Sequence, residues 1–114
     1  MIKKNDVRIG NLVSVNNSDF IGYLDGIDRY AYVTRDNSTF VSVNWEHLFG
    51  VLFTKKQYDL LDMGSHFITY SEKLNIFYVN LHGEYTMPFT FVHELQNIYY
   101  MIEKKELYIS KLLN

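Results

Sequence analysis

Residues 91–104 read FVHELQNIYYMIEK. Apolar residues recur there three or four positions apart, so on a helix they would form one stripe, made of Val92, Leu95, Ile98, Tyr99 and Ile102. A stripe of this kind is typical of a helix that lies on a sheet. Lys104 and Lys105 fall in the expected last turn, where positive charge complements the helix dipole. The stretch therefore predicts a helix from Phe91 to Lys104 with its apolar side against strands.

Much of the remaining chain alternates between apolar and polar residues, which is the pattern of β-strands. The first half predicts four short strands, at residues 12–15, 20–24, 30–34 and 39–43. Gly22, inside the second of them, indicates a bulge or a close approach of two backbones. The second half predicts three more strands, at residues 66–70, 75–81 and 85–89. Pro88 cannot donate a backbone hydrogen bond to a sheet, so it should lie at a sheet edge or at the end of a strand.

A short helix is predicted between the two groups of strands. Thr54 and Gln57 have the spacing of a capping box, and Gly64 suits the position just past a helix end. We therefore expect an α+β fold with four parts: a small bent antiparallel sheet or partial barrel, a short capped helix, a second antiparallel hairpin set, and a C-terminal helix packed on the sheet. The chain has 114 residues, the usual size of a single domain, so residues 1–114 are expected to form one.

Composition narrows the classes of function. Cysteine is absent, which excludes disulfides and thiolate metal sites. Eleven basic and thirteen acidic residues give a formal charge of 11 − 13 = −2, which argues against broad non-specific binding to nucleic acid. No apolar run is long enough to span a bilayer, and the charged start does not resemble a signal peptide. We expect a cytoplasmic protein without a membrane partner.

One segment resembles a metal site but lacks a ligand. His93-Glu94-Leu95-Gln96-Asn97 begins like the zinc-binding pattern H-E-x-x-H, and Asn97 stands where the second histidine would be. We therefore expect no metal, no cofactor and no catalytic residues, with His93, Asn97 and Tyr100 as the polar flank of the helix. A hydrolase remains an alternative, and it would need a cleft that joins His82 to His93.

Binding is the function that the composition favours. Ten tyrosines are many for a small domain, and exposed tyrosine is frequent at protein interfaces. Arg29, Tyr30, Tyr32 and Arg35 share one expected strand, with the arginines flanking the tyrosines. We predict this strand face as the interface with a protein partner. The same residues could stack bases and hold phosphates, so binding of single-stranded RNA is an alternative. Homo-oligomerisation through this face also stays open.

Two segments resemble a group of small bacterial and prophage-encoded proteins. Arg8-Ile9-Gly10-Asn11-Leu12-Val13 is similar to the group's R-I-G-N-L-V opening, and residues 91–100 are similar to its Y-V-H-Q-L-Q-N-L-Y-F helix. The sequence departs from the group at Glu94, where glutamine is usual, and at residues 103–107, which lack the usual T-G-E-E-L. The group has no established activity, so no functional residue is carried over. The resemblance implies a phage or prophage accessory protein that acts in the cytoplasm of a bacterial host. The expectation that follows is an anti-CRISPR protein that binds and inhibits a CRISPR nuclease or ribonucleoprotein.

Overall fold

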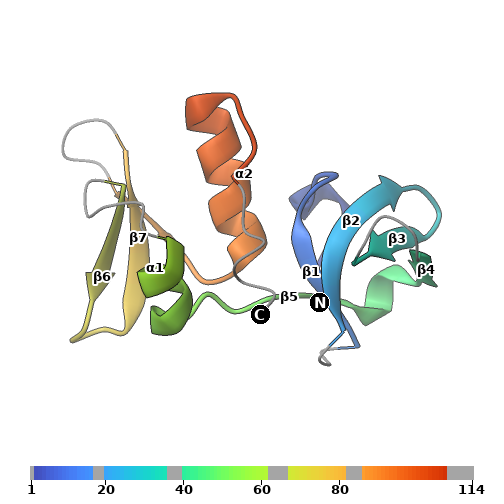
Figure 1. Cartoon of the computed structure of the whole chain (residues 1–114), viewed down its shortest axis with the longest axis horizontal. Coiled ribbons are helices and arrows are strands. Elements are labelled where there is room, and N and C mark those ends of the chain that lie inside the picture. Colours follow the sequence, from blue (N-terminus) through green and yellow to red (C-terminus); the bar gives the residue numbers. More distant parts are fainter. Residues whose placement is uncertain (1, 17–19, 36–39, 62–66, 82–85, 108–114) are drawn as a thin grey trace.

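The chain forms two antiparallel sheets with a helix between them (Figure 1). The computed structural model describes residues 2–16, 20–35, 40–61, 67–81 and 86–107. The five-stranded sheet has the order β4-β3-β2-β1-β5, and the three-stranded sheet has the order β6-β7-β8. The first sheet contains β1 (Leu12–Val15), β2 (Ile21–Ile27), β3 (Ala31–Thr34), β4 (Phe40–Val43) and β5 (Leu48–Gly50). The second contains β6 (Ile68–Ser71), β7 (Ile76–Asn80) and β8 (Thr86–Phe89).

Four helical segments accompany the strands. The longest is α2 (Val92–Glu103), and α1 (Lys55–Leu61) precedes the three-stranded sheet. Short 3-10 helices, η1 (Lys4–Asp6) and η2 (Trp45–His47), lie before β1 and between β4 and β5. The predicted α+β class is confirmed, and the described residues form no closed barrel. Strand β5 was missed, because a three-residue strand is too short to show a period.

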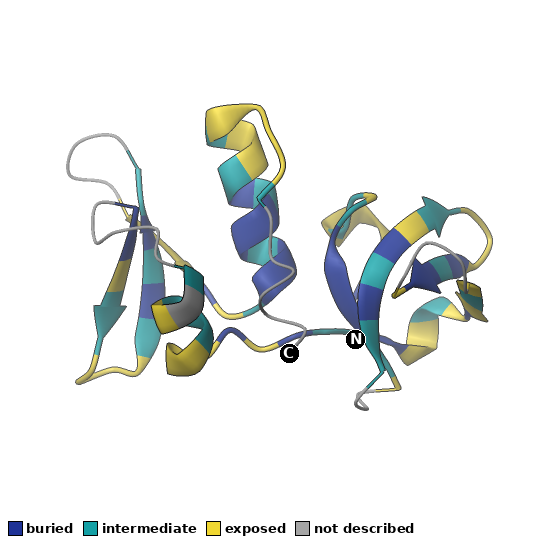
Figure 2. Cartoon of the chain, in the orientation of Figure 1, coloured by how far each residue is buried: buried dark blue, intermediate teal, exposed yellow. Residues whose placement is uncertain are grey.

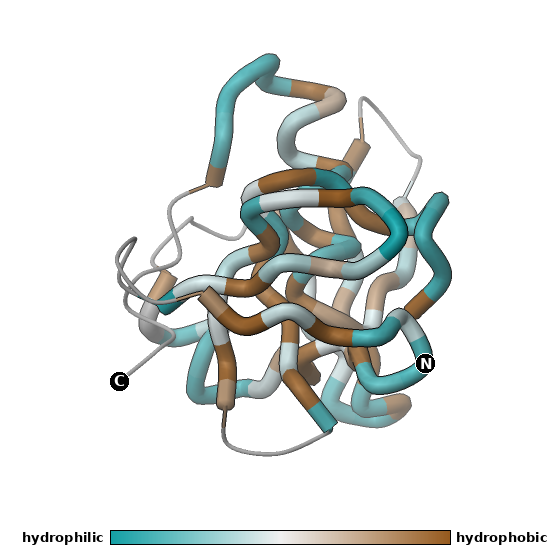
Figure 3. Tube along the Cα trace, turned by 90° about the vertical axis from the view of Figure 1, so that its right-hand side faces the viewer, coloured by the Kyte–Doolittle hydropathy of each residue, from teal (hydrophilic) through white to brown (hydrophobic). Residues whose placement is uncertain are grey.

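Strand β1 contributes to two separate cores. Its alternate residues point to opposite faces, so Leu12 packs with α2 and Val13 packs inside the five-stranded sheet. The core inside that sheet, here called the strand core, consists of Ile2, Val13, Leu24, Ala31, Val33, Val43 and Leu48. Figure 3 views the molecule from this side and shows hydrophilic segments concentrated at the outer turns. Burial on both faces of β1 makes it the strand that joins the two halves.

The second core lies between α2 and the three-stranded sheet and is here called the helix core. It consists of Leu12, Val51, Phe53, Phe67, Ile68, Phe77, Val79, Phe89, Val92, Leu95 and Ile98. Figure 2 shows the buried face along α2, and its exposed residues gather toward the helix end. The predicted stripe is therefore confirmed: Val92, Leu95 and Ile98 are buried, and Tyr99 and Ile102 pack against them.

Three local predictions are also confirmed. The backbone N–H of Thr54 donates to Oε1 of Gln57 at 2.7 Å, so the capping box of α1 is present. Pro88 lies in β8, an edge strand of its sheet. Gly22 is a site of close backbone approach, because a Cβ there would stand 2.7 Å from the carbonyl oxygen of Thr34. The bulge lies elsewhere in β2, between Leu24 and Gly26. Gly64 falls outside the described residues.

A buried glutamine connects α2 to the N-terminal segment. Gln96 is 1% exposed, and its Oε1 accepts the backbone N–H of Leu12 at 2.7 Å. Its Nε2 donates to the carbonyl oxygen of Gly10 at 3.0 Å. The side-chain amide thus pairs with the backbone as a neighbouring strand would. Both of its hydrogen-bonding atoms have partners, which is the condition for burying an amide at low cost.

Asn97 and Arg8 extend this connection. Oδ1 of Asn97 accepts from Nδ2 of Asn11 at 2.8 Å and from Nε of Arg8 at 3.2 Å. Arg8 also forms an ion pair with Glu106, and its guanidinium lies 4.2 Å from the ring centroid of Tyr100. We call the residues of this network the clasp: Arg8, Gly10, Asn11, Leu12, Gln96, Asn97, Tyr100 and Glu106. Residues 8–13 and 91–100 supply all of the clasp except Glu106.

We predict that Gln96→Leu lowers the free energy of unfolding by about 2–4 kcal/mol, because the Leu12 N–H and the Gly10 carbonyl lose their partners while buried. Urea denaturation followed by circular dichroism measures the change. Glu103→Ala, an exposed substitution on the same helix, should change stability by less than about 0.5 kcal/mol. Equal stability of the Gln96→Leu variant and the wild type would contradict the structural role assigned to the amide.

Candidate functional site

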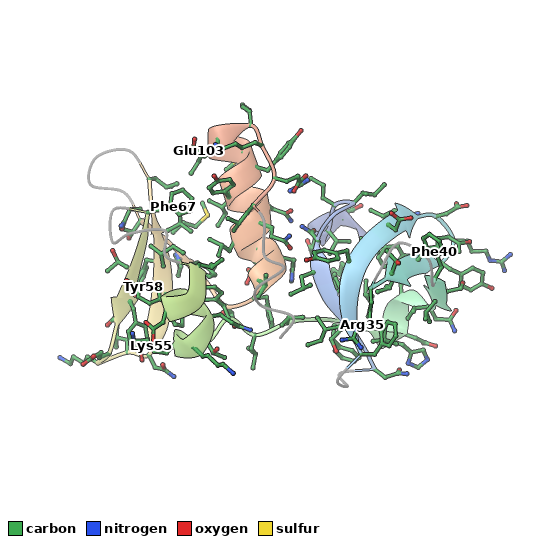
Figure 4. All side chains as sticks on the ribbon, in the orientation of Figure 1. Arg35, Phe40, Lys55, Tyr58, Phe67 and Glu103 are labelled. Carbon is green, nitrogen blue, oxygen red and sulfur yellow. The ribbon has the colours of Figure 1, made fainter. Side chains whose placement is uncertain are left out.

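The four residues predicted as an interface lie around β3. Arg29 and Tyr30 precede the strand, Tyr32 lies within it and Arg35 follows it. Each arginine contacts an aromatic ring: Arg29 lies 5.9 Å from the centroid of Tyr30, and Arg35 lies 5.8 Å from that of Phe20. Figure 4 places Arg35 in the half of the molecule formed by the five-stranded sheet, away from α1.

This face is less continuous than the sequence suggested. Tyr30 is exposed, but Tyr32 is half-buried, with its ring over the backbone of Gly26. The strand of four residues between the arginines spans roughly 13 Å, so the two guanidinium groups do not converge on one point. The face offers one exposed tyrosine and separated positive charges.

The larger of two described pockets lies elsewhere, where β5, β8 and the start of α2 meet. Its volume is about 740 Å³. Its wall combines apolar side chains with polar ones, and the polar side chains are those of Asp6, His93, Glu94 and Asn97. The apolar members are Ile2, Phe49, Leu52, Met87, Pro88, Phe91 and Ile98. We call this the junction pocket, because its walls come from both halves of the chain. The sequence did not predict it, since its members are scattered from residue 2 to residue 98.

The rim of the junction pocket exposes apolar side chains. Leu52 is 58% exposed and Met87 is 38% exposed, and Pro88, the next residue of β8, is also exposed. Leu52 lies where the chain after β5 crosses the chain before α2, and it forms an isolated β-bridge with Phe91. Local backbone pairing therefore holds Leu52 at the surface. Contact between its apolar side chain and water is unfavourable in free energy.

His93 lies in the wall of the junction pocket and is buried, with 5% of its surface exposed. Its ring stacks on Phe91 at a centroid distance of 5.7 Å. Gly50 permits this arrangement, because a Cβ there would lie 2.7 Å from the Phe91 ring and 3.0 Å from Cε1 of His93. The prediction that His93 belongs to the polar flank of the helix is therefore wrong, because its side chain is buried. Asn97 and Tyr100 both belong to the clasp, and Tyr100 is exposed.

The charge of His93 is set by this burial. Desolvation lowers the pKa of His93 below its ordinary value of 6.5, and the carboxylates of Glu94 and Asp6 oppose that shift. Its Nδ1 is buried and has no hydrogen-bond partner among the described residues. The ring is therefore neutral near pH 7, and the junction pocket carries the negative charges of Asp6 and Glu94.

Glu94 also stabilises the start of α2. Its Oε1 accepts the backbone N–H of Phe91 at 2.9 Å and that of Thr90 at 3.0 Å. This is the glutamate half of a capping box, and Phe91 has no side-chain oxygen to supply the other half. The carboxylate is thus held at the mouth of the junction pocket by the helix that it caps.

A smaller pocket lies on the other side of Leu52 and Pro88. Its volume is about 440 Å³, and Phe53, Phe77 and Phe89 contribute aromatic walls. Lys55 is its one ionisable lining residue among those described, and Nζ of Lys55 lies 2.8 Å from Oδ1 of Asp59. Figure 4 shows Lys55 and Tyr58 together on α1. The positive charge in this pocket is therefore already paired.

No three His, Asp or Glu side chains in the described part of the chain gather in a way that could hold a metal ion. His82, the other histidine of the hydrolase alternative, lies outside the described residues.

No described helix is long and apolar enough to cross a membrane.

Comparison with known proteins returns no match: no family model, no curated protein and no solved structure is similar to this chain. The site is therefore characterised by its own geometry alone.

We predict that acidification destabilises the wild-type protein partly through His93. Its pKa in the folded protein is lower than in the unfolded chain, so the unfolded chain binds more protons as the pH falls below about 6.5. The free energy of unfolding should decrease between about pH 7.5 and about pH 5.5. His93→Leu should retain stability at the higher pH and lose less on acidification, because no buried imidazole remains to be protonated.

The matched control is His47→Gln, since His47 is exposed. Urea denaturation at both pH values measures the effect. A His93→Leu variant with the same pH dependence as wild type, or a His47→Gln variant that removes that dependence, would contradict the role of His93.

Proposed function

We propose that this protein acts by binding another protein, and that the rim of the junction pocket is the interface. The observation that carries the proposal is the exposure of Leu52 and Met87 beside a pocket of about 740 Å³ whose walls combine apolar and polar side chains. Exposed apolar side chains around a concave site are a common mark of interaction surfaces. Asp6 and Glu94 add polar groups that would give such an interface specificity.

The position of the pocket also supports this proposal. Its walls belong to β5, β8 and α2, and the clasp and the two cores hold these elements together. A surface supported in this way is pre-organised, so little ordering is required when a partner binds. The junction pocket offers a hollow and more exposed apolar surface than the face around Arg29, Tyr30, Tyr32 and Arg35.

The resemblance to prophage-encoded proteins supplies the finer part of the proposal. The partner would be a component of a bacterial defence system, such as a CRISPR nuclease, and binding would inhibit it without chemistry by this chain. The face around β3 is retained as a second candidate interface, because the guanidinium groups of Arg29 and Arg35 lie over aromatic rings and are available for a protein or for single-stranded RNA.

A comparison of two exposed leucines tests the proposed interface. Leu52 is 58% exposed at the junction pocket, and Leu74 is 59% exposed in the turn before β7. We predict that Leu52→Asp lowers retention of the specific partner at least about tenfold, because a charge would have to be desolvated at the interface. Leu74→Asp should retain the partner at the wild-type level.

The measurement uses immobilised protein and lysates of bacteria that carry CRISPR systems, with retained proteins quantified by mass spectrometry. A candidate partner is then purified, and its affinity for each variant and its nuclease activity are measured. Loss of binding in an Arg29→Ala, Arg35→Ala double variant, together with unchanged binding in Leu52→Asp, would move the interface to the β3 face. Full nuclease activity in the presence of saturating protein would contradict inhibition.

A further inference from the structure

We propose that the junction pocket takes a lysine or arginine side chain of the protein partner. This inference rests on the proposed protein-binding function and adds the chemistry of the group that enters the pocket. Three features of the described residues carry it: the sign of the charge at the pocket, the free acceptor atoms there, and the apolar wall.

The ionisable residues of the junction pocket favour a cation. They are Asp6, His93 and Glu94, and none of the described lining residues is a lysine or an arginine. Burial keeps the imidazole neutral, so it does not offset the two carboxylates. Asp6 and Glu94 both belong to the wall of the same pocket, so a cation there would meet two carboxylates.

Acceptor atoms are available at these two carboxylates. Asp6 uses its backbone carbonyl to accept from Asn97, and no described residue donates to its carboxylate. Glu94 uses Oε1 for the two N–H groups at the start of α2, while Oε2 accepts from no described residue. Ammonium and guanidinium groups carry several donors and form charge-assisted hydrogen bonds with such oxygens.

The wall of the pocket suits the stem of a long basic side chain. Lysine and arginine bury their methylene groups along apolar surface and keep the charged end at polar atoms. Phe49, Leu52 and Met87 supply such surface, and Phe91 belongs to the same wall. The smaller pocket beyond Pro88 has no comparable preference, because the charge of Lys55 is paired with Asp59.

The test uses capped tripeptides as probes: acetyl-Leu-Xaa-Leu-amide with arginine, lysine, norleucine or glutamate in the middle. Each is titrated into the uniformly 15N-labelled full chain, and amide shifts are followed by NMR. We expect the arginine and lysine peptides to shift the amides of Gly50, Leu52 and Glu94, with an affinity at least tenfold higher than that of the glutamate peptide. An affinity of the norleucine peptide equal to that of the arginine peptide would overturn the inference.

The matched variant is Asp6→Asn with Glu94→Gln. The glutamine carbonyl can still accept the N–H groups of Thr90 and Phe91, so the start of α2 is preserved, and thermal unfolding verifies this. We expect the double variant to bind the arginine peptide at least tenfold more weakly and the norleucine peptide unchanged. Unchanged arginine binding, or shifts confined to the β3 face, would overturn the inference. Those results would not decide whether the protein binds a partner at this pocket. The Leu52→Asp comparison tests that proposed function separately.

Discussion

The side-chain amide of Gln96 is the interaction on which the rest of the structure depends. It bonds to the backbone on both sides of Asn11, at Gly10 and Leu12, and so fixes α2 to the start of β1. Strand β1 lies between β2 and β5 and has one residue in each core. This contact fixes the position of α2, which covers the three-stranded sheet, relative to the five-stranded sheet.

The junction pocket is a consequence of that connection. Two halves with separate cores meet along the clasp on one side, and elsewhere they leave a hollow between β5, β8 and α2. Gly50 lets the ring of Phe91 approach β5 closely, and Phe91 in turn stacks on His93. The same helix start that carries Glu94 therefore closes the fold and presents a carboxylate at the pocket.

Local patterns in the sequence predicted both α-helices and every described strand except β5, because each of these elements repeats or begins with a signal that neighbouring residues carry. The stripe from Val92 to Ile102 and the capping box at Thr54 are of this kind. The clasp could not be predicted in this way, since Gln96 and Asn97 looked like ordinary polar helix residues, and their partners lie more than eighty positions away. The junction pocket was missed for the same reason. The tyrosine and arginine strand was found because its residues are neighbours in sequence, and whether it is an interface stays a prediction.

The central claim is that a protein partner binds at the junction pocket and not at β3. Hydrogen exchange, followed by mass spectrometry on the protein alone and on its complex with the partner, tests this most directly. The account predicts slower exchange in the complex across residues 50–54 and 86–94, with residues 29–35 unchanged. Slower exchange at residues 29–35, with residues 50–54 and 86–94 unchanged, would contradict it.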